Sequence, residues 1–203
     1  MIDRNKLRKD FIVLREAMRP EERDFANSAI SEKLAGLDVI RNAKVIAAYM
    51  AFKNEVSLEA FFVECAEKKL CFPRKAAGSA VVGQNNCAGY ELAGVPGSVF
   101  SREEERGKFF VPGLYGIEEP VRECAAVPRI EPEVWLVPGV AFDISGGRLG
   151  WGGGVYDRML SGISAVTIGI GYDLQLQERV PLEPHDQLMD FIVTEKRVIK
   201  VAR

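Results

Sequence analysis

The sequence is poor in the residues that build metal and disulfide sites. It has a single histidine, His185, and four cysteines, none of which form a Cys-x-x-Cys pair. This pattern argues against a structural zinc site, which needs closely spaced cysteines and histidines. We therefore expect the cysteines to be reduced thiols that pack in the interior. They are Cys65, Cys71, Cys87 and Cys124.

Long apolar segments and a strong net charge are also missing. No apolar run approaches the roughly 20 residues that a membrane-spanning helix requires, and residues 1–6 are polar and lack a signal-peptide core. The formal net charge of −2 gives no general attraction to nucleic acid or to a membrane surface. We expect a cytoplasmic protein that binds neither. At 203 residues, a single domain over residues 1–203 is expected.

Glycine, by contrast, is concentrated in one stretch. Gly150-Trp151-Gly152-Gly153-Gly154 holds four glycines in five residues, and ordering them is costly because glycine loses the most backbone entropy. The stretch lies between a predicted strand, Val134–Val137, and a predicted helix that starts at Val155. Bare N–H groups at the start of a helix favour an anion such as phosphate, and Arg148 adds a cation beside them.

Known phosphate-loop patterns do not match this stretch. A P-loop ends in Gly-Lys-Ser/Thr, which is absent here. A dinucleotide fingerprint counted from Gly150 needs a glycine where the chain has Val155. From the residue types alone, a flexible surface turn before a helix stays an alternative.

Two segments carry a resemblance to a known family. VPGVAFD, residues 137–143, and RLGWGGGVYDR, residues 148–158, resemble the signature of 5-formyltetrahydrofolate cyclo-ligase, also called 5,10-methenyltetrahydrofolate synthetase. The chain departs at Val155, where the family usually has an aromatic residue. Residues 115–120 resemble the Gly-Ile-x-Glu-Pro segment that lies close to the folate site in the family, although a simple turn is the alternative.

Apolar runs that alternate with helical patterns predict an α/β fold. Buried strands are expected at residues 44–50, 70–72, 134–137, 165–171 and 188–193, with a helix capped by Ser57 after the first and Pro73 closing the second. Two N-terminal helices that pack as a hairpin are expected, the first burying Leu7, Phe11, Leu14 and Met18. We predict a single-domain, three-layer Rossmann-like sandwich with a mostly parallel sheet and helices on both faces.

Residues 76–107 are predicted to form an irregular excursion with a hairpin, because they are rich in glycine, alanine, serine and polar residues. The strand candidates there are Val81-Val82 and Tyr90–Leu92. The charged run at residues 102–106 is expected to be solvated.

The ends of three predicted strands are expected to meet at one rim, because functional residues in parallel sheets gather at the carboxyl ends of the strands. Met50 and Glu55 follow one strand, Arg74 and Lys75 follow the next, and the glycine stretch follows the third. From the residues alone, Met50 could pack in the core, Glu55 could be a solvated carboxylate and Arg74 a surface charge.

The resemblance implies roles for individual residues. Arg148 and Arg8 are implied as catalytic cations. The implied ATP contacts are Arg4, Asn5, Lys6, Leu7, Arg8, Arg148, Leu149, Gly150, Trp151, Gly152, Gly153, Gly154, Val155 and Tyr156. The implied folate contacts are Met50, Glu55, Arg74, Trp151, Gly152, Gly153, Gly154, Val155 and Tyr156, and Asp157 is the implied Mg²⁺ ligand. Without the resemblance, Arg4 and Arg8 would be a solvated pair on one helix face, and Asp157 would cap or pair on its helix.

The resemblance also implies an activity, the ATP-dependent cyclisation of 5-formyltetrahydrofolate to 5,10-methenyltetrahydrofolate with release of ADP and phosphate. The expected cofactors are ATP and Mg²⁺, the expected partner is a reduced folate, and a monomer is expected. Two alternatives stay open, a nucleotide-binding regulatory module and a sugar-phosphate isomerase-like enzyme. His185 beside Asp186 suggests a catalytic dyad, but no Gly-x-Ser-x-Gly elbow accompanies it, so a structural or supporting role is favoured.

Overall fold

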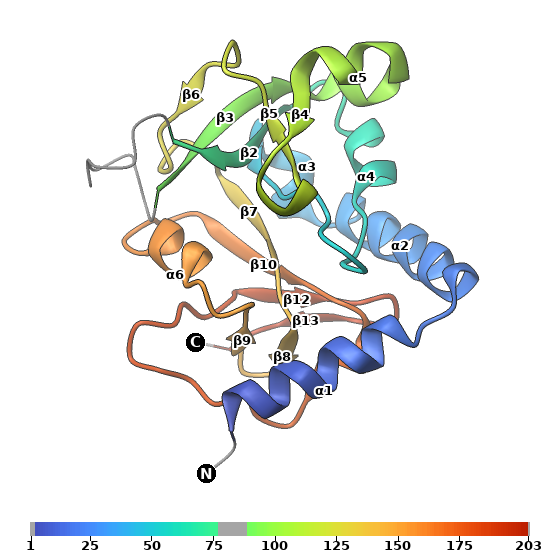
Figure 1. Ribbon diagram of the computed structural model, residues 1–203, viewed down its shortest axis with the longest axis vertical. Coiled ribbons are helices and arrows are strands. Elements are labelled where there is room, and N and C mark those ends of the chain that lie inside the picture. The colour runs from blue at the N-terminus through green and yellow to red at the C-terminus, as the bar shows by residue number, and fades with distance from the viewer. Residues whose placement is uncertain (1–2, 77–88, 203) are drawn as a thin grey trace.

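The computed structural model describes residues 3–76 and 89–202 and has a mixed α/β fold (Figure 1). Val81-Val82 and Cys87 lie outside the described residues. The helices are α1 (Arg4–Glu16), α2 (Pro20–Ala35), α3 (Asp38–Asn42), α4 (Glu59–Glu64), α5 (Glu103–Phe109) and α6 (Val155–Leu160). Short 3-10 turns are η1 (Gly97–Ser101), η2 (Leu114–Gly116) and η3 (Asp173–Gln175).

A large sheet forms the centre of the molecule, with the strand order β13-β12-β10-β7-β1-β2-β3-β6. The five strands from β12 to β2 run parallel, whereas the outer pairs β12–β13, β2–β3 and β3–β6 are antiparallel. The predicted mostly parallel sheet is therefore confirmed. Its strands are β1 (Val45–Ala47), β2 (Lys69–Lys75), β3 (Tyr90–Pro96), β6 (Ala126–Val127), β7 (Val134–Pro138), β10 (Val166–Ile170), β12 (Phe191–Val193) and β13 (Val198–Lys200). Two small sheets contain β8 (Ala141–Asp143), β9 (Arg148–Leu149) and β11 (Leu176–Gln177), and β4 (Phe110–Pro112) with β5 (Glu118–Pro120).

Alternate side chains of the central strand β7 belong to different core clusters. Val134 and Leu136 pack in the cluster that contains residues of α2 and α4. Trp135 and Val137 pack in the cluster that contains residues of α6. Because successive side chains of a strand point to opposite faces, helices cover both faces of the sheet. This arrangement is consistent with the predicted three-layer, Rossmann-like sandwich.

Both predicted N-terminal helices are present, but they join different clusters. Phe11 of α1 packs with Leu149 and the residues around it, whereas α2 contributes to the cluster with α4. The hairpin packing of α1 and α2 stays a prediction. The expected burial of Leu14 is wrong, since its side chain is 50% exposed, while Arg15 is 2% exposed. The buried stripe follows residues 7, 11 and 15 because Arg15 lies against the ring of Trp151.

Two predicted boundaries are wrong. Pro73 lies inside β2, not after it, and this is tolerated because the pairing of β1 with β2 ends at Cys71 and no ladder bond from residue 73 is needed on that side. Leu58, not Ser57, is the N-cap residue of α4, and the Ser57 hydroxyl lies 3.5 Å from the backbone N of Glu59.

The segment after β2 is more regular than predicted. β3 pairs along the whole of β2, so Tyr90–Leu92 belongs to the main sheet. The charged run lies in and beside α5, where Arg106 forms ion pairs with Glu59 and Glu118. The run is thus only partly solvated, because Arg106 links α5 to α4 and to β5.

The described cysteines are free and buried, as expected. Burial raises the pKa of the Cys65 and Cys71 thiols to about 12, which keeps them protonated and unreactive at neutral pH. No helix among the described residues is long and apolar enough to cross a membrane.

A slot lined by glycine holds the ring of Phe142, which comes from β8 and is 1% exposed. A Cβ atom placed on Gly139, Gly169 or Gly171 would lie 2.5, 2.6 or 2.9 Å from an atom of this ring. The ring joins the small sheet to the ends of β7 and β10. A side chain at any of these three glycine positions would overlap the ring.

We expect Gly169→Ala to lower the free energy of unfolding by about 1–3 kcal/mol, because the new methyl group overpacks the Phe142 ring. Gly107→Ala is the control, since a Cβ there meets no atom within 4 Å and lies on α5. The control should be neutral or stabilising by up to about 1 kcal/mol. Urea unfolding measures both variants, and equal stability of the two would contradict the slot.

Candidate active site

A cavity of about 610 Å³ lies where the parallel strands end. Its lining includes Met50 after β1, Pro73 near the end of β2 and Pro138 at the end of β7, together with the glycine stretch. The predicted meeting of three strand ends therefore occurs. A site at the carboxyl ends of parallel strands is usual for open α/β sheets.

The glycine loop, residues 150–154, forms one wall of this cavity between β9 and α6. Gly152 and Gly154 have φ angles of 101° and 60°, in the part of conformational space that favours glycine. The Arg8 Nε donates to the carbonyl of Gly150 at 2.9 Å, and Arg158 donates to the carbonyl of Gly153. Arginine side chains from two helices thus order the loop.

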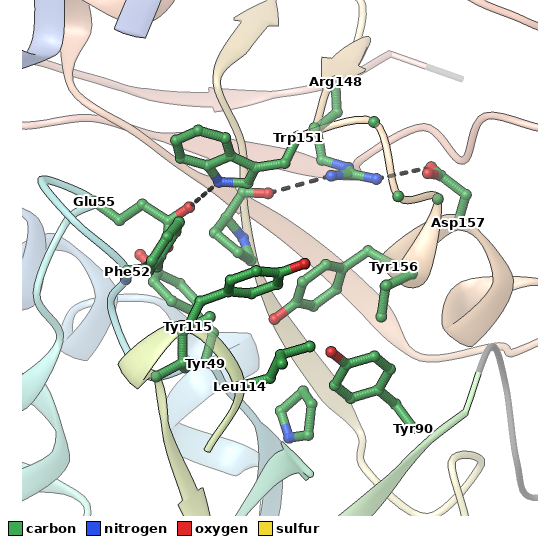
Figure 2. Close-up of a pocket in the computed structure, with 18 of the residues that line it drawn as sticks. Tyr49, Phe52, Glu55, Tyr90, Leu114, Tyr115, Arg148, Trp151, Tyr156 and Asp157 are labelled. Carbon is green, nitrogen blue, oxygen red and sulfur yellow. Dashed lines mark hydrogen bonds and ion pairs between the residues drawn. The ribbon is translucent and has the colours of Figure 1, made fainter. Parts of the chain in front are cut away.

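Arg148 is 4% exposed and is tied into the loop rather than lying at its edge. Its guanidinium donates to Asp157 Oδ1 at 2.8 Å and to the carbonyl of Pro138 at 3.3 Å (Figure 2). Its Cζ atom also lies 5.7 Å from the centroid of the Tyr156 ring. Arg148 still lines the cavity, so one cation both holds the wall together and contributes positive potential inside it.

The first helix supplies two further cations to the cavity. Arg4 donates to Asp186 at 2.7 Å, and Arg8 reaches the loop. Burial alone would raise the pKa of Asp186, but the hydrogen bond and the charge of Arg4 hold it below the usual value. Arg4 and Arg8 both line the cavity. Four of the predicted ATP contacts do not line it, and these are Asn5, Lys6, Leu7 and Leu149.

Opposite the arginines, Glu55 is held in a buried position. Its two oxygens accept from the indole Nε1–H of Trp151 at 2.7 Å and from the backbone N–H of Phe52 at 3.0 Å (Figure 2). Glu55 is 7% exposed, and this burial raises its pKa, although the two hydrogen bonds and the charges of Arg15 and Arg148 oppose the shift. A carboxylate in such surroundings can recognise a ligand N–H group.

Aromatic rings form much of the remaining lining. Phe52 packs edge-on against Trp151 at 5.4 Å between centroids, and its ring is 6.4 Å from that of Tyr115. Figure 2 shows Tyr49, Tyr90, Tyr115 and Tyr156 around the same space. Burial raises the pKa of Tyr156 far above its usual value, so its hydroxyl stays a neutral hydrogen-bond donor. Flat rings of a ligand would find stacking partners here.

Sequence reasoning missed Phe52 and Arg15, and it also missed three further residues that line the cavity, Tyr49, Lys53 and Tyr90. Phe52 could have been found, because it lies in the loop that leads to Glu55. Arg15 gave no signal, since an arginine on an amphipathic helix is normally solvated. In the fold, its guanidinium lies 5.3 Å from the centroid of Trp151 and supports the indole from behind. Trp151 itself is 38% exposed, at the rim where it was predicted.

Arg74 does not line the cavity, contrary to the expectation for a folate contact. Its side chain is buried, and its guanidinium donates to Glu91 and to the carbonyls of Val121 and Cys124. Arg74 alternates with Pro73 along β2, so when Pro73 faces the cavity Arg74 points to the other face of the sheet.

His185 is exposed, and its Nε2 atom lies 3.4 Å from a carboxylate oxygen of Glu183. Its ion-pair partners among the described residues are Glu183 and Asp186, and neither is a serine or cysteine nucleophile. Asp157, the metal ligand that the resemblance implies, also lines the cavity. Both hydrogen bonds that it accepts from described residues, from Arg148 and from the backbone N–H of Gln187, go to Oδ1. This leaves Oδ2 as the candidate ligand atom.

Known proteins are similar to this chain over much or all of its length. The profile of the 5-formyltetrahydrofolate cyclo-ligase family matches residues 1–195. A 5-formyltetrahydrofolate cyclo-ligase of Mycoplasma genitalium is 28% identical over 199 residues, which are 95% of this chain and 98% of that protein. A protein of the same name from Mycolicibacterium smegmatis is 40% identical over 92 residues, which are 44% of this chain and 47% of that protein. The chain thus matches about half the length of this second relative.

The fold is similar to that of a solved protein. The 5,10-methenyltetrahydrofolate synthetase of Aquifex aeolicus superposes with a TM-score of 0.79 at 32% identity, covering 98% of this chain and 93% of that one. Because the likeness of sequence and fold extends over nearly the whole length, the chain belongs to the 5-formyltetrahydrofolate cyclo-ligase family.

Proposed function

We propose that this protein converts 5-formyltetrahydrofolate to 5,10-methenyltetrahydrofolate, with ATP converted to ADP and phosphate. The observation that carries the proposal is one cavity with two unlike walls. One wall is a glycine loop flanked by Arg4, Arg8 and Arg148, and the other holds aromatic rings and the buried carboxylate of Glu55. The first wall suits a triphosphate, and the second suits a flat pterin with N–H donors.

In the proposed reaction, the formyl oxygen attacks the γ-phosphorus of ATP and ADP leaves. A neighbouring folate nitrogen then attacks the activated formyl carbon, and inorganic phosphate departs with the former formyl oxygen. The protein forms no covalent bond. Its work is to align the formyl oxygen with the phosphorus and to neutralise the charge that develops on the phosphoryl group. We assign this to Arg8, Arg148 and the loop N–H groups.

Mg²⁺ fits the charges of this site. Mg²⁺ prefers oxygen ligands, and it commonly takes one or two carboxylates together with phosphate oxygens and water. We propose Asp157 as the protein ligand. When bound, the ion would neutralise part of the charge on the transferred phosphoryl group.

Val155, in place of the family's usual aromatic residue, is compatible with the proposed activity. A missing stacking contact is worth about 0.5–1.5 kcal/mol, or roughly a tenfold change in affinity, which is too small to abolish the reaction. Val155 lines the cavity, and Tyr49, Tyr90 and Tyr156 also line it. We propose that these rings cover the pterin in its place.

Family membership favours the enzyme over the regulatory module and the isomerase-like enzyme. Binding measurements separate the three, because the enzyme should bind both MgATP and the reduced folate, the module only ATP, and the isomerase not both together. The single domain over residues 1–203, the monomer and the cytoplasmic location stay predictions of the sequence.

We expect Arg8→Ala to lower kcat/KM by roughly 10²–10³-fold, the range for losing one preorganised charged donor. Lys9→Ala is the control, because Lys9 is the exposed neighbour on α1 and does not line the cavity. The absorbance of the methenyl product follows turnover. Equal kcat/KM in the two variants would remove Arg8 from the mechanism.

Trp151 should report ligand binding by fluorescence in a Trp135→Phe background. Trp135 is 1% exposed and its Nε1 has no hydrogen-bond partner in the described part of the chain, so phenylalanine loses no hydrogen bond there. Ligands that displace water from the cavity should shift the emission of Trp151 to shorter wavelength. An unchanged spectrum with saturating MgATP and saturating 5-formyltetrahydrofolate would contradict the proposed site.

Glu55→Gln should lower kcat/KM by roughly 10- to 100-fold, because a charged acceptor for the pterin is lost. Stability tests the burial of Glu55 separately. Because its folded-state pKa is raised, Glu55 stabilises the fold most below the pKa of an exposed glutamate, and this stabilisation is lost as the pH rises through the raised pKa. Relative to Glu55→Gln, the wild type should therefore lose stability as the pH rises above about 4, the ordinary pKa of an exposed glutamate. If the free energies of urea unfolding of the wild type and of Glu55→Gln changed with pH in the same way, this prediction would be wrong.

A further inference from the structure

The backbone is unusual at two places beside the cavity. Lys53 and Tyr115 are the residues other than glycine that have positive φ angles in the described part of the chain, 53° and 61°. Both line the cavity, and both are exposed, so they mark its opening. Residues with side chains adopt this conformation at an energetic cost, and such residues are concentrated at functional sites.

The position of Lys53 is fixed by a tight turn. The backbone N–H of Glu55 donates to the carbonyl of Phe52 at 3.1 Å, and the backbone N–H of Phe52 donates to the Glu55 carboxylate at 3.0 Å. Lys53 is the second residue of this turn, where a positive φ normally selects glycine or asparagine. The turn holds the lysine beside the site.

Lys53 differs from the other cations that line the cavity. Arg4 and Arg148 are paired with carboxylates, and Arg8 donates to oxygen atoms of Gly150 and Asn5. Lys53 has no carboxylate or carbonyl partner among residues 3–76 and 89–202. Its Nζ lies 5.3 Å from the centroid of the Phe52 ring and 5.2 Å from that of Trp151. These cation–π contacts hold the ammonium group but leave its hydrogens available to a ligand.

Two carboxylates of β5 also belong to the lining of the cavity. Glu118 and Glu119 of β5 line the cavity, and the Glu119 carboxylate accepts from the backbone N–H of Lys75. Glu118 is paired with Arg106, so Glu119 is the β5 carboxylate that would repel an anionic ligand group, whereas Lys53 would attract one. The reduced folate of the proposed function has such a group, because its flat rings end in a glutamate with carboxylates.

We propose that the ammonium group of Lys53 binds the glutamate carboxylates of the substrate at the opening of the cavity, which rests on the proposed function. The rings lie among the aromatic side chains, and the tail extends past Phe52 toward solvent. Lys53 thus replaces Arg74, which the resemblance implied as a folate contact but which does not line the cavity. A phosphate group of ATP is the other anion that Lys53 could meet, and the test separates the two.

The test compares Lys53→Asn with Lys75→Asn. Asparagine tolerates positive φ, so the turn is kept. Lys75 is an exposed lysine that lies 5.9 Å from the centroid of the Tyr90 ring and does not line the cavity. Lys53→Asn should raise the KM for 5-formyltetrahydrofolate roughly three- to tenfold, with the KM for MgATP unchanged. The difference in this KM between Lys53→Asn and the wild type should become smaller at high salt, because salt screens the charge. Lys75→Asn should have the same KM as the wild type.

The same assays with 5-formyltetrahydropteroate, which lacks the glutamate, should show no difference between Lys53→Asn and the wild type. An equal rise in KM for both substrates, or a rise in the KM for MgATP instead, would overturn the proposal. Calorimetric titration of 5-formyltetrahydrofolate into each variant measures binding without turnover. If the protein binds the folate in a Lys53-dependent way but forms no methenyl product, the proposed function fails and the Lys53 site stands. If it binds no folate, both fail.

Discussion

The candidate site depends on the buried ion pair between Arg148 and Asp157. A buried charge is strongly unfavourable without a partner, so each of these residues requires the other. Through them, β9 is tied to the start of α6, and the bond from Arg148 to the carbonyl of Pro138 adds the end of β7. A Cβ on Gly150 would lie 2.7 Å from Nη1 of the same guanidinium, so a side chain at this position would displace the arginine. The flexible stretch is ordered because a fixed charge is packed beneath it.

The two walls of the cavity are joined through a side chain rather than through the backbone. Trp151 belongs to the glycine loop, yet its indole donates to Glu55, which follows β1. Arg15 of α1 and Lys53 contact the faces of the same indole. Segments more than 100 residues apart in the chain (residue 151 minus residue 15 is 136) therefore share one aromatic ring. Loss of order in the loop would also release Glu55.

The pattern of apolar residues and glycines along the sequence was sufficient to predict the elements that depend on neighbouring residues alone. The apolar run at β7 and the start of α6 at Val155 were predicted from hydrophobicity and glycine alone, and the strand ends meet as the parallel sheet requires. The errors occur where tertiary contacts override local preference. Arg15 is buried in place of Leu14, because an aromatic ring from residue 151 covers it. Arg74 turns away from the cavity because carbonyls of residues 121 and 124 receive its guanidinium. No pattern in one segment reveals a partner in another, and the roles of the lining residues remain proposals.

The Phe142 slot also limits how this chain can evolve. Gly139, Gly169 and Gly171 all lie against one ring, and a Cβ on Gly169 would in addition lie 2.8 Å from Cδ1 of Ile192. At Gly139, where the three nearest atoms all belong to the ring, an added methyl group is harmful while the phenylalanine is present and becomes acceptable after the ring has been replaced by a smaller group. The loss of the ring alone leaves a void and is harmful as well. Each single step therefore lowers fitness even when the double change does not, which is reciprocal sign epistasis. Lineages of this fold should keep the phenylalanine and its three glycines together or lose them together.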